Sequence, residues 1–169
     1  AAKFGAIMNL IVSIFTMAFQ PFSMKIIHDD DRLKIGNTLD LLLRYYLLIF
    51  GGGFLMLTLI APILLNFVAP KTFALAITAI PFLTFSAVMF GVTYFSSLGT
   101  WKKDKAIRFS LVLIISALIN IFLNIFSIPL YGMEGAAIST AISMTILVVL
   151  SFIVSQSTYR LPYSSIRVI

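Results

Sequence analysis

Two asparagines, Asn120 and Asn124, stand four residues apart in an apolar run and are the clearest candidates for polar chemistry in this sequence. Residues with this spacing project from the same face of a helix. In a lipid environment such amides can bond a neighbouring helix, for ~0.6 and at most ~1.7 kcal/mol. The alternative is a polar lining along a substrate path, to which Asn9 and Gln20 would also belong. We favour the interhelical bond for the asparagine pair.

Turn-forming and small residues follow the asparagine pair directly. Pro129 is expected to end the helix, Gly132 and Gly135 to form the turn, and Ala136-Ala137 to begin a second helix. Proline cannot continue the hydrogen bonding of a helix, and glycine adopts turn conformations without steric cost. The spacing therefore predicts two helices joined by a minimal turn, with small residues that let the two backbones approach closely.

A compact basic cluster follows Trp101. Its members are Lys102, Lys103, Lys105 and Arg108. Such clusters commonly set the orientation of a membrane protein, with tryptophan as an interfacial anchor, and we favour this interpretation. The alternative is attraction of anionic headgroups or of a pyrophosphate, at ~1 kcal/mol per basic residue. Arg44, at the mouth of another apolar run, is a similar candidate.

Metal-binding residue types gather in the segment His28-Asp29-Asp30-Asp31. Four adjacent side chains cannot all converge on one ion, so we expect a solvated loop there and no metal site. The sequence shows no nucleophile–base pair and no phosphate-binding loop, and it contains no cysteine. We therefore expect neither enzymatic activity nor a cofactor.

The composition indicates the environment that surrounds these residues. Of the 169 residues, 60% are hydrophobic and 11% are charged, and the mean hydropathy is +1.08. Average soluble domains contain ~25% charged residues. A chain this apolar cannot cover itself with polar surface, so we expect it to lie in lipid. Its net charge of +6 comes from basic residues in short loops and does not indicate nucleic-acid binding.

Five apolar runs are each long enough to cross the ~30 Å hydrocarbon core as a helix, which takes ~20 residues. They cover residues 4–22, 41–69, 73–99, 107–130 and 135–158. Because the runs are continuously apolar, they lack the alternation typical of membrane β-strands. The sequence therefore predicts one all-α domain, a polytopic bundle of five membrane-spanning helices.

Several of these helices contain residues that weaken a helix. Each glycine costs ~1 kcal/mol relative to alanine, and each proline frees a backbone carbonyl that other groups must satisfy. The positions are Pro21, Gly51, Gly52, Gly53, Pro62 and Pro81. They indicate hinges or points of close packing, although both residue types are common in membrane helices. For Pro21 a plain helix end is the alternative.

Basic residues are distributed unevenly between the two ends of these helices. Ten lie in the 23–44 connector, the 100–108 loop and the C-terminal tail, and the other side holds only Lys3 and Lys71. Basic residues of short loops concentrate on the cytoplasmic side of a membrane. We therefore predict a cytoplasmic-membrane protein in which these three segments are cytoplasmic and the N-terminal end and two tight turns face outward.

Four features of the chain resemble one family of membrane proteins. They are Phe19-Gln20-Pro21-Phe22-Ser23 before a charged segment, Ala61-Pro62 before a short turn, Gly99 with Lys102-Lys103, and the run NIFLNIFSIPLYGMEGAAIST at 120–140. Together they make the chain similar to the C-terminal half of polysaccharide biosynthesis or export proteins. Their superfamily also holds O-antigen flippases, lipid II flippases and multidrug and toxic compound extrusion transporters.

This resemblance covers nearly the whole chain, and the run 120–140 is its most specific part. It implies the C-terminal lobe of a two-lobe transporter of twelve to fourteen helices, which flips undecaprenyl-pyrophosphate-linked oligosaccharide by alternating access. The implied partners are the lipid bilayer, this lipid-linked oligosaccharide and a missing N-terminal lobe. The chain begins without Met and without the pattern of a signal peptide, and we expect it to be an internal or truncated piece of a larger protein.

Two other functions remain open at this point. One is a multidrug or metabolite cation antiporter of the same superfamily, which an intramembrane carboxylate in the absent lobe would favour. The other is a membrane enzyme of polysaccharide assembly. The shortness of both predicted outer turns argues against the enzyme, because a catalytic site of that kind needs a substantial outer loop with charged residues.

Overall fold

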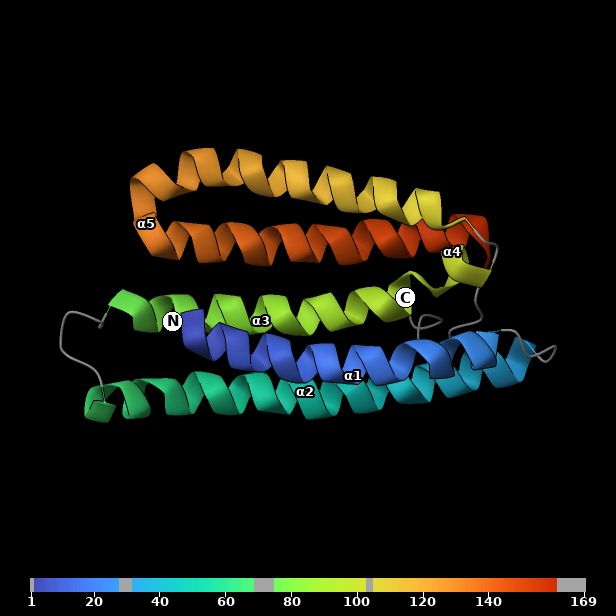
Figure 1. Ribbon diagram of the computed structural model, residues 1–169, viewed down its shortest axis with the longest axis horizontal. Helices are drawn as coiled ribbons and strands as arrows, with labels where there is room; N and C mark the ends of the chain where they lie inside the picture. The colour runs from blue at the N-terminus through green and yellow to red at the C-terminus, as the bar shows by residue number, and fades with distance from the viewer. Residues whose placement is uncertain (1, 28–31, 69–74, 103–104, 161–169) are drawn as a thin grey trace, which may run out of the picture.

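The computed structural model describes residues 2–27, 32–68, 75–102 and 105–160, and all regular elements in this part of the chain are helices. They are α1 (Ala2–Ile27), α2 (Arg32–Val68), α3 (Leu75–Ser96), α4 (Leu98–Lys102) and α5 (Ala106–Thr158). The long helices run side by side along the molecule, and the short α4 lies at one end (Figure 1). The predicted all-α class is therefore confirmed for the described residues.

The 53 residues of α5 form two antiparallel arms rather than one straight rod (Figure 1). Gly132 interrupts the helix with φ 55° and ψ −129°, a backbone conformation that residues with a side chain rarely adopt. We call residues 106–131 the first arm and residues 133–158 the second arm. Because the chain reverses at Gly132, Arg108 near the start of the first arm donates a 3.1 Å hydrogen bond to Thr158 at the end of the second.

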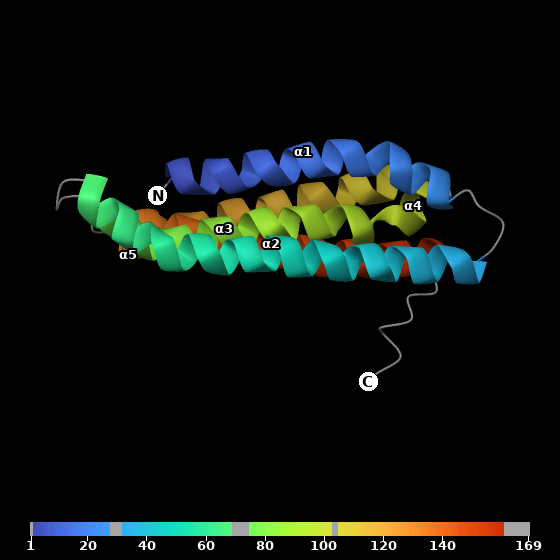
Figure 2. The same ribbon diagram turned by 90° about the horizontal axis from the view of Figure 1, so that it is seen from below.

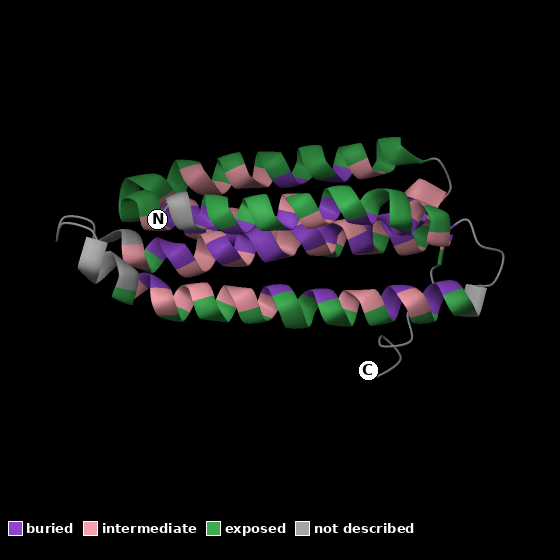
Figure 3. Ribbon diagram, turned by 60° about the horizontal axis from the view of Figure 1, so that its bottom comes forward, coloured by how far each residue is buried: buried purple, intermediate pink, exposed green. Residues whose placement is uncertain are grey.

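Helix α3 lies at the centre of the bundle. It packs against α1, α2 and α5, and Figure 2 shows it between α1 and α2 with α5 behind. Most of its buried side chains are small or of medium size, as at Ala79, Ile80, Thr84 and Ala87, and Phe95 is the large exception. Figure 3 shows buried residues along α3 and exposed residues over most of the first arm of α5. The two halves of the molecule, α1–α2 and α5, are thus joined mainly through α3.

An aromatic cluster fills the space between α1, α2 and α3. Its rings belong to Phe15, Phe19, Tyr46, Phe50 and Phe95, with neighbouring ring centroids 4.3–6.4 Å apart. The Tyr46 hydroxyl is buried and donates a 2.8 Å hydrogen bond to the Val88 carbonyl of α3. This bond satisfies the polar end of the ring in an otherwise apolar core.

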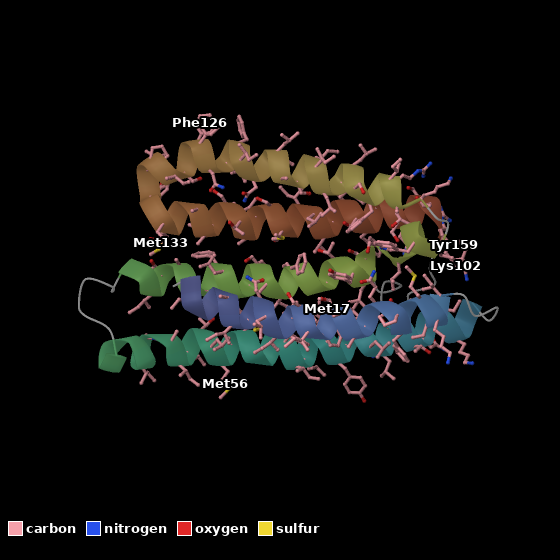
Figure 4. The ribbon with its side chains drawn as sticks, viewed as in Figure 1. Met17, Met56, Lys102, Phe126, Met133 and Tyr159 are labelled. Atoms are coloured by element: carbon pink, nitrogen blue, oxygen red, sulfur yellow. The ribbon has the colours of Figure 1, made fainter. Side chains whose placement is uncertain are left out.

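Large apolar side chains cover the outside of the bundle. Ile107 is 77% exposed, Met17 76% and Leu130 74%, and Figure 4 shows Met56 and Phe126 projecting outward from opposite edges. By length and composition, α1, α2, α3 with α4, and α5 are each able to cross a membrane. An outer surface of this kind suits lipid rather than water and indicates a membrane protein.

The helices are longer than several of the predicted spans. Helix α1 continues to Ile27, so Pro21 lies inside it and does not end it. Helix α2 begins at Arg32, nine residues before the predicted start, so much of the 23–44 connector is helical. A helix satisfies its backbone hydrogen bonds internally and has no physical reason to stop where the apolar run stops. The Asp40–Arg44 ion pair, at 2.9 Å and four residues apart, supports this polar extension.

Two further boundaries differ from the predicted ones. The predicted span 73–99 is divided at Ser97 into α3 and α4, and its first two residues lie outside the described part of the chain. The expected helix break at Pro129 was wrong, because the first arm continues through Pro129 and ends at Gly132. Gly135, also expected in the turn, lies inside the second arm. A proline one turn before a helix end removes few hydrogen bonds, whereas the reversal of the chain needs the glycine conformation.

Candidate functional site

A chain of hydrogen bonds joins the two arms of α5. Asn124 donates to the side-chain oxygen of Asn120 at 3.0 Å, Asn120 donates to the Ser143 hydroxyl at 2.9 Å, and Ser143 donates to the Ser139 carbonyl. We call these four residues the polar seam. The Asn120–Ser143 bond is the interhelical bond that the asparagine spacing suggests, and it crosses from the first arm to the second.

Three small residues at intervals of four along the second arm make this close contact possible. Gly135, Ser139 and Ser143 are all buried and lie along one face. At Gly135, a side chain would overlap the backbone carbonyl of the opposite arm. Small residues of this kind let helix backbones approach in lipid, where apolar side chains gain nothing from leaving water.

A hollow of about 250 Å³ lies between the arms beside the polar seam. Asn120 and Ser143 line it together with Ser116 and Thr140. The buried hydroxyl of Ser116 has no hydrogen-bond partner, and neither has the side-chain oxygen of Asn124. An unsatisfied buried polar group costs ~1–3 kcal/mol. The hollow therefore offers neutral amide and hydroxyl groups, among them the unpartnered Ser116 hydroxyl, to a small polar guest between two apolar helices.

The polar seam holds no ionisable group. Within the described residues, no three His, Cys, Asp or Glu side chains lie together as a metal site would require. The segment 28–31, the one stretch of the sequence with that composition, lies outside the described residues. The chemistry that the seam offers is therefore hydrogen bonding by amides and hydroxyls.

The other two predicted path residues lie elsewhere. Asn9 and Gln20 are exposed on α1, a helix that packs against α3 and α2. They are not part of the polar seam, which belongs entirely to α5. The four path candidates thus divide into a half-buried pair between helices and an exposed pair on the outside of the described bundle.

Described basic residues gather at the end of the bundle that carries α4. They are Lys25, Lys34, Arg44, Lys102, Lys105, Arg108 and Arg160. Lys102 lies 5.0 Å from the ring centre of Tyr159, and Figure 4 shows the two side by side. Lys103 lies outside the described residues. We call this end the basic end of the bundle.

The short helix α4 attaches the basic end of α3 to the second arm of α5. The Gly99 amide donates a 2.8 Å hydrogen bond to the Ser155 hydroxyl, and the Trp101 indole donates to Ser97 at 3.1 Å. A side chain at Gly99 would come within 2.5 Å of the Ser155 hydroxyl and 2.7 Å of two backbone carbonyls. Trp101 and Lys102 are therefore held in a fixed junction.

The predicted hinge positions of α2 and α3 sit within continuous helix. The helix α2 runs through Gly51, Gly52 and Gly53 without interruption. A side-chain carbon added at Gly51 or Gly52 would meet no atom within 4 Å, so no described helix packs closely there. Pro62 is half-buried inside α2, and Pro81 lies inside α3.

Sequence reasoning missed the partners of the asparagines. Ser116, Thr140 and Ser143 complete the site, and the sequence pattern could have indicated some of these residues. In the second arm Gly135, Ser139 and Ser143 follow one another at intervals of four residues, which marks one buried helix face. Ser116 gave no such signal, because it is a single serine in an apolar run.

Comparison with protein families, with curated proteins and with solved structures finds no match to this chain.

Proposed function

We propose that the chain crosses the membrane five times, with each arm of α5 making one crossing. Each arm of 26 residues is ~39 Å long at ~1.5 Å per residue, more than the ~30 Å of hydrocarbon. A straight helix of 53 residues would be ~80 Å long, far beyond any bilayer. The basic end then faces the cytoplasm, and the turn at Gly132 faces outward.

We further propose that the chain is part of a transporter that flips an undecaprenyl-pyrophosphate-linked oligosaccharide to the outer leaflet. The observation that carries this proposal is the polar seam with the neighbouring Ser116, which leaves the oxygens of Asn124 and Ser116 unpartnered between two otherwise apolar helices. Hydroxyls and amides are the groups that bind sugars, and polar groups are kept inside a membrane where they serve a path or a contact. The basic end supplies positive charge where the pyrophosphate would be collected.

The transport proposal is tested in cells that lack the full-length protein. We expect lipid-linked oligosaccharide to accumulate with its sugar facing the cytoplasm and surface polysaccharide to be lost. Wild-type protein should restore export, and a variant carrying Asn120→Leu and Asn124→Leu should not. Ile121→Val, on the exposed face of the same arm, is the matched control and should restore export fully.

The opposite results would remove the proposal. Normal lipid intermediates together with new drug sensitivity would assign the protein to the multidrug branch of the superfamily. Normal export by the asparagine variant, at normal expression, would leave the polar seam with a purely structural role.

The role of the basic end is tested separately. Replacing Lys102, Lys103 and Lys105 with Gln should reduce export of the lipid-linked substrate while membrane insertion stays intact, because ~1 kcal/mol of attraction is lost per charge. Equal export by wild type and variant would leave the cluster with an orienting role alone.

A further inference from the structure

The polar contact between the two arms of α5 is interrupted one helical turn from the Asn120–Ser143 bond, on the side of the basic end. One turn along the first arm stands Ser116, and one turn along the second arm stands Leu147. Both are buried, and both line the hollow of about 250 Å³ between the arms. A leucine has no polar atom to offer, and the Ser116 hydroxyl is unpartnered at 5% exposure.

Other hydroxyls that line the hollow can still accept a hydrogen bond. The Thr140 hydroxyl donates to the Ala136 carbonyl at 2.8 Å, and the Ser143 hydroxyl accepts from Asn120. A hydroxyl oxygen has two lone pairs, so both oxygens retain the capacity to accept a further bond. Ser116 can both donate and accept. The hollow therefore presents one free donor and three accepting hydroxyl oxygens, all of them uncharged.

This hydrogen-bonding pattern matches water. A buried water typically makes ~3 hydrogen bonds to polar groups that would otherwise be unsatisfied. The volume of about 250 Å³ exceeds the ~30 Å³ that a water molecule occupies in the liquid, so space does not limit its binding. The rest of the lining is apolar, and apolar cavities stay dry. We therefore expect water beside the hydroxyls and not beside the apolar walls.

The depth of Ser116 makes a protein-bound water significant. From residue 106 to residue 116 the first arm advances ~15 Å at ~1.5 Å per residue. This is about half of the ~30 Å hydrocarbon core. Lipid chains offer no hydrogen bond at this depth, so a polar group there must be satisfied by the protein or by water that the protein holds.

We propose that Ser116, Thr140 and the polar seam bind water between the arms of α5, near the middle of the hydrocarbon core. The water accepts a hydrogen bond from one hydroxyl and donates to the oxygens of its neighbours. It extends the chain of hydrogen bonds between the arms by one helical turn towards the basic end. The inference rests on the membrane placement proposed above and does not depend on the transported substrate.

The test uses thiol chemistry, because the chain contains no cysteine of its own. Met144→Cys places one thiol in the hollow and leaves all of its amides and hydroxyls in place. Leu118→Cys is the matched control, because Leu118 is 60% exposed on the first arm and lies at a similar distance from the Gly132 turn. Each full-length variant is reconstituted in phosphatidylcholine vesicles, and its rate of reaction with N-ethylmaleimide is measured. The reactive form is the thiolate, which forms in contact with water and not in hydrocarbon.

We expect the thiol of Met144→Cys to react at least about tenfold faster than that of Leu118→Cys. Adding Ser116→Ala to Met144→Cys should slow the reaction about fivefold, the equivalent of the ~1 kcal/mol of one hydrogen bond to the water. Adding Ser116→Thr instead keeps the hydroxyl and should preserve the fast reaction. Circular dichroism verifies that every variant keeps its helix content.

Two sets of results would overturn the proposal. Equally slow reaction at positions 144 and 118 would show that the hollow is dry or filled by an acyl chain. An unchanged rate with Ser116→Ala, or the same loss with Ser116→Thr, would show that the hydroxyl does not hold the water. Equally fast reaction at both positions, or failure of the chain to float with the vesicles, would instead overturn the membrane placement.

Discussion

The hydrogen bond between Asn120 and Ser143 should contribute measurably to the stability of the α5 hairpin. It is 2.9 Å long, joins the two arms, and has a second bond behind it, in which Asn124 donates to Asn120 at 3.0 Å. Hydrogen bonds between membrane helices average ~0.6 kcal/mol and reach ~1.7 kcal/mol. Ser143→Ala removes one of these bonds and should cost ~0.6 kcal/mol. Asn120→Ala removes both and should cost ~1.2 kcal/mol.

The assay is unfolding of the purified chain in mixed micelles, followed by circular dichroism as the denaturing detergent increases. A double-mutant cycle of the two substitutions isolates their coupling, which we expect to be ~0.6 kcal/mol. Asn9→Ala is the control, because Asn9 is exposed on α1, and it should change stability by less than ~0.5 kcal/mol. A coupling near zero, or a loss from Asn9→Ala as large as that from Asn120→Ala, would refute the reasoning.

Three further substitutions test the fold by the same unfolding assay. Gly132→Ala forces a side chain to φ 55° and should cost ~1–3 kcal/mol, and an unchanged midpoint would show that the turn does not need this conformation. Gly135→Leu places a side chain on the opposite backbone and should cost ~1–3 kcal/mol by overpacking, and stability equal to wild type would contradict the close contact of the arms. Tyr46→Phe loses the 2.8 Å hydrogen bond to the Val88 carbonyl and should lower the free energy of unfolding by ~1 kcal/mol. Tyr131→Phe is the control and should be neutral, because Tyr131 is exposed. Equal effects of the two substitutions would refute a specific role for the buried hydroxyl.

Much of the local structure follows from the sequence. The long apolar runs predict the helices because a helix is the element that satisfies its own backbone in lipid. The reversal of α5 follows from the glycine at 132, and the contact between its arms follows from the spacing of Asn120 and Asn124. These features depend on residues close to one another in the chain, where helical periodicity decides which side chains share a face.

The remaining features depend on contacts that periodicity does not reveal. The apolar runs underestimate the lengths of α1 and α2. Hydropathy marks the boundary of the hydrocarbon core, whereas the helices continue beyond it. The unpartnered hydroxyl of Ser116 becomes visible only when the second arm is placed against it. The central position of α3 likewise depends on contacts between distant parts of the chain, such as the bond from Tyr46 of α2 to Val88 of α3, 42 residues further on.

The central claim is that α5 crosses the membrane twice and places the basic end and the Gly132 turn on opposite sides. Because the chain contains no cysteine, single cysteines can be introduced by Met133→Cys and Lys105→Cys and labelled in intact cells with a membrane-impermeant maleimide. The account predicts that the cysteine at position 133 reacts from outside and that the one at position 105 reacts only after the cells are permeabilised. Labelling of both from the same side would contradict the membrane hairpin and the topology built on it.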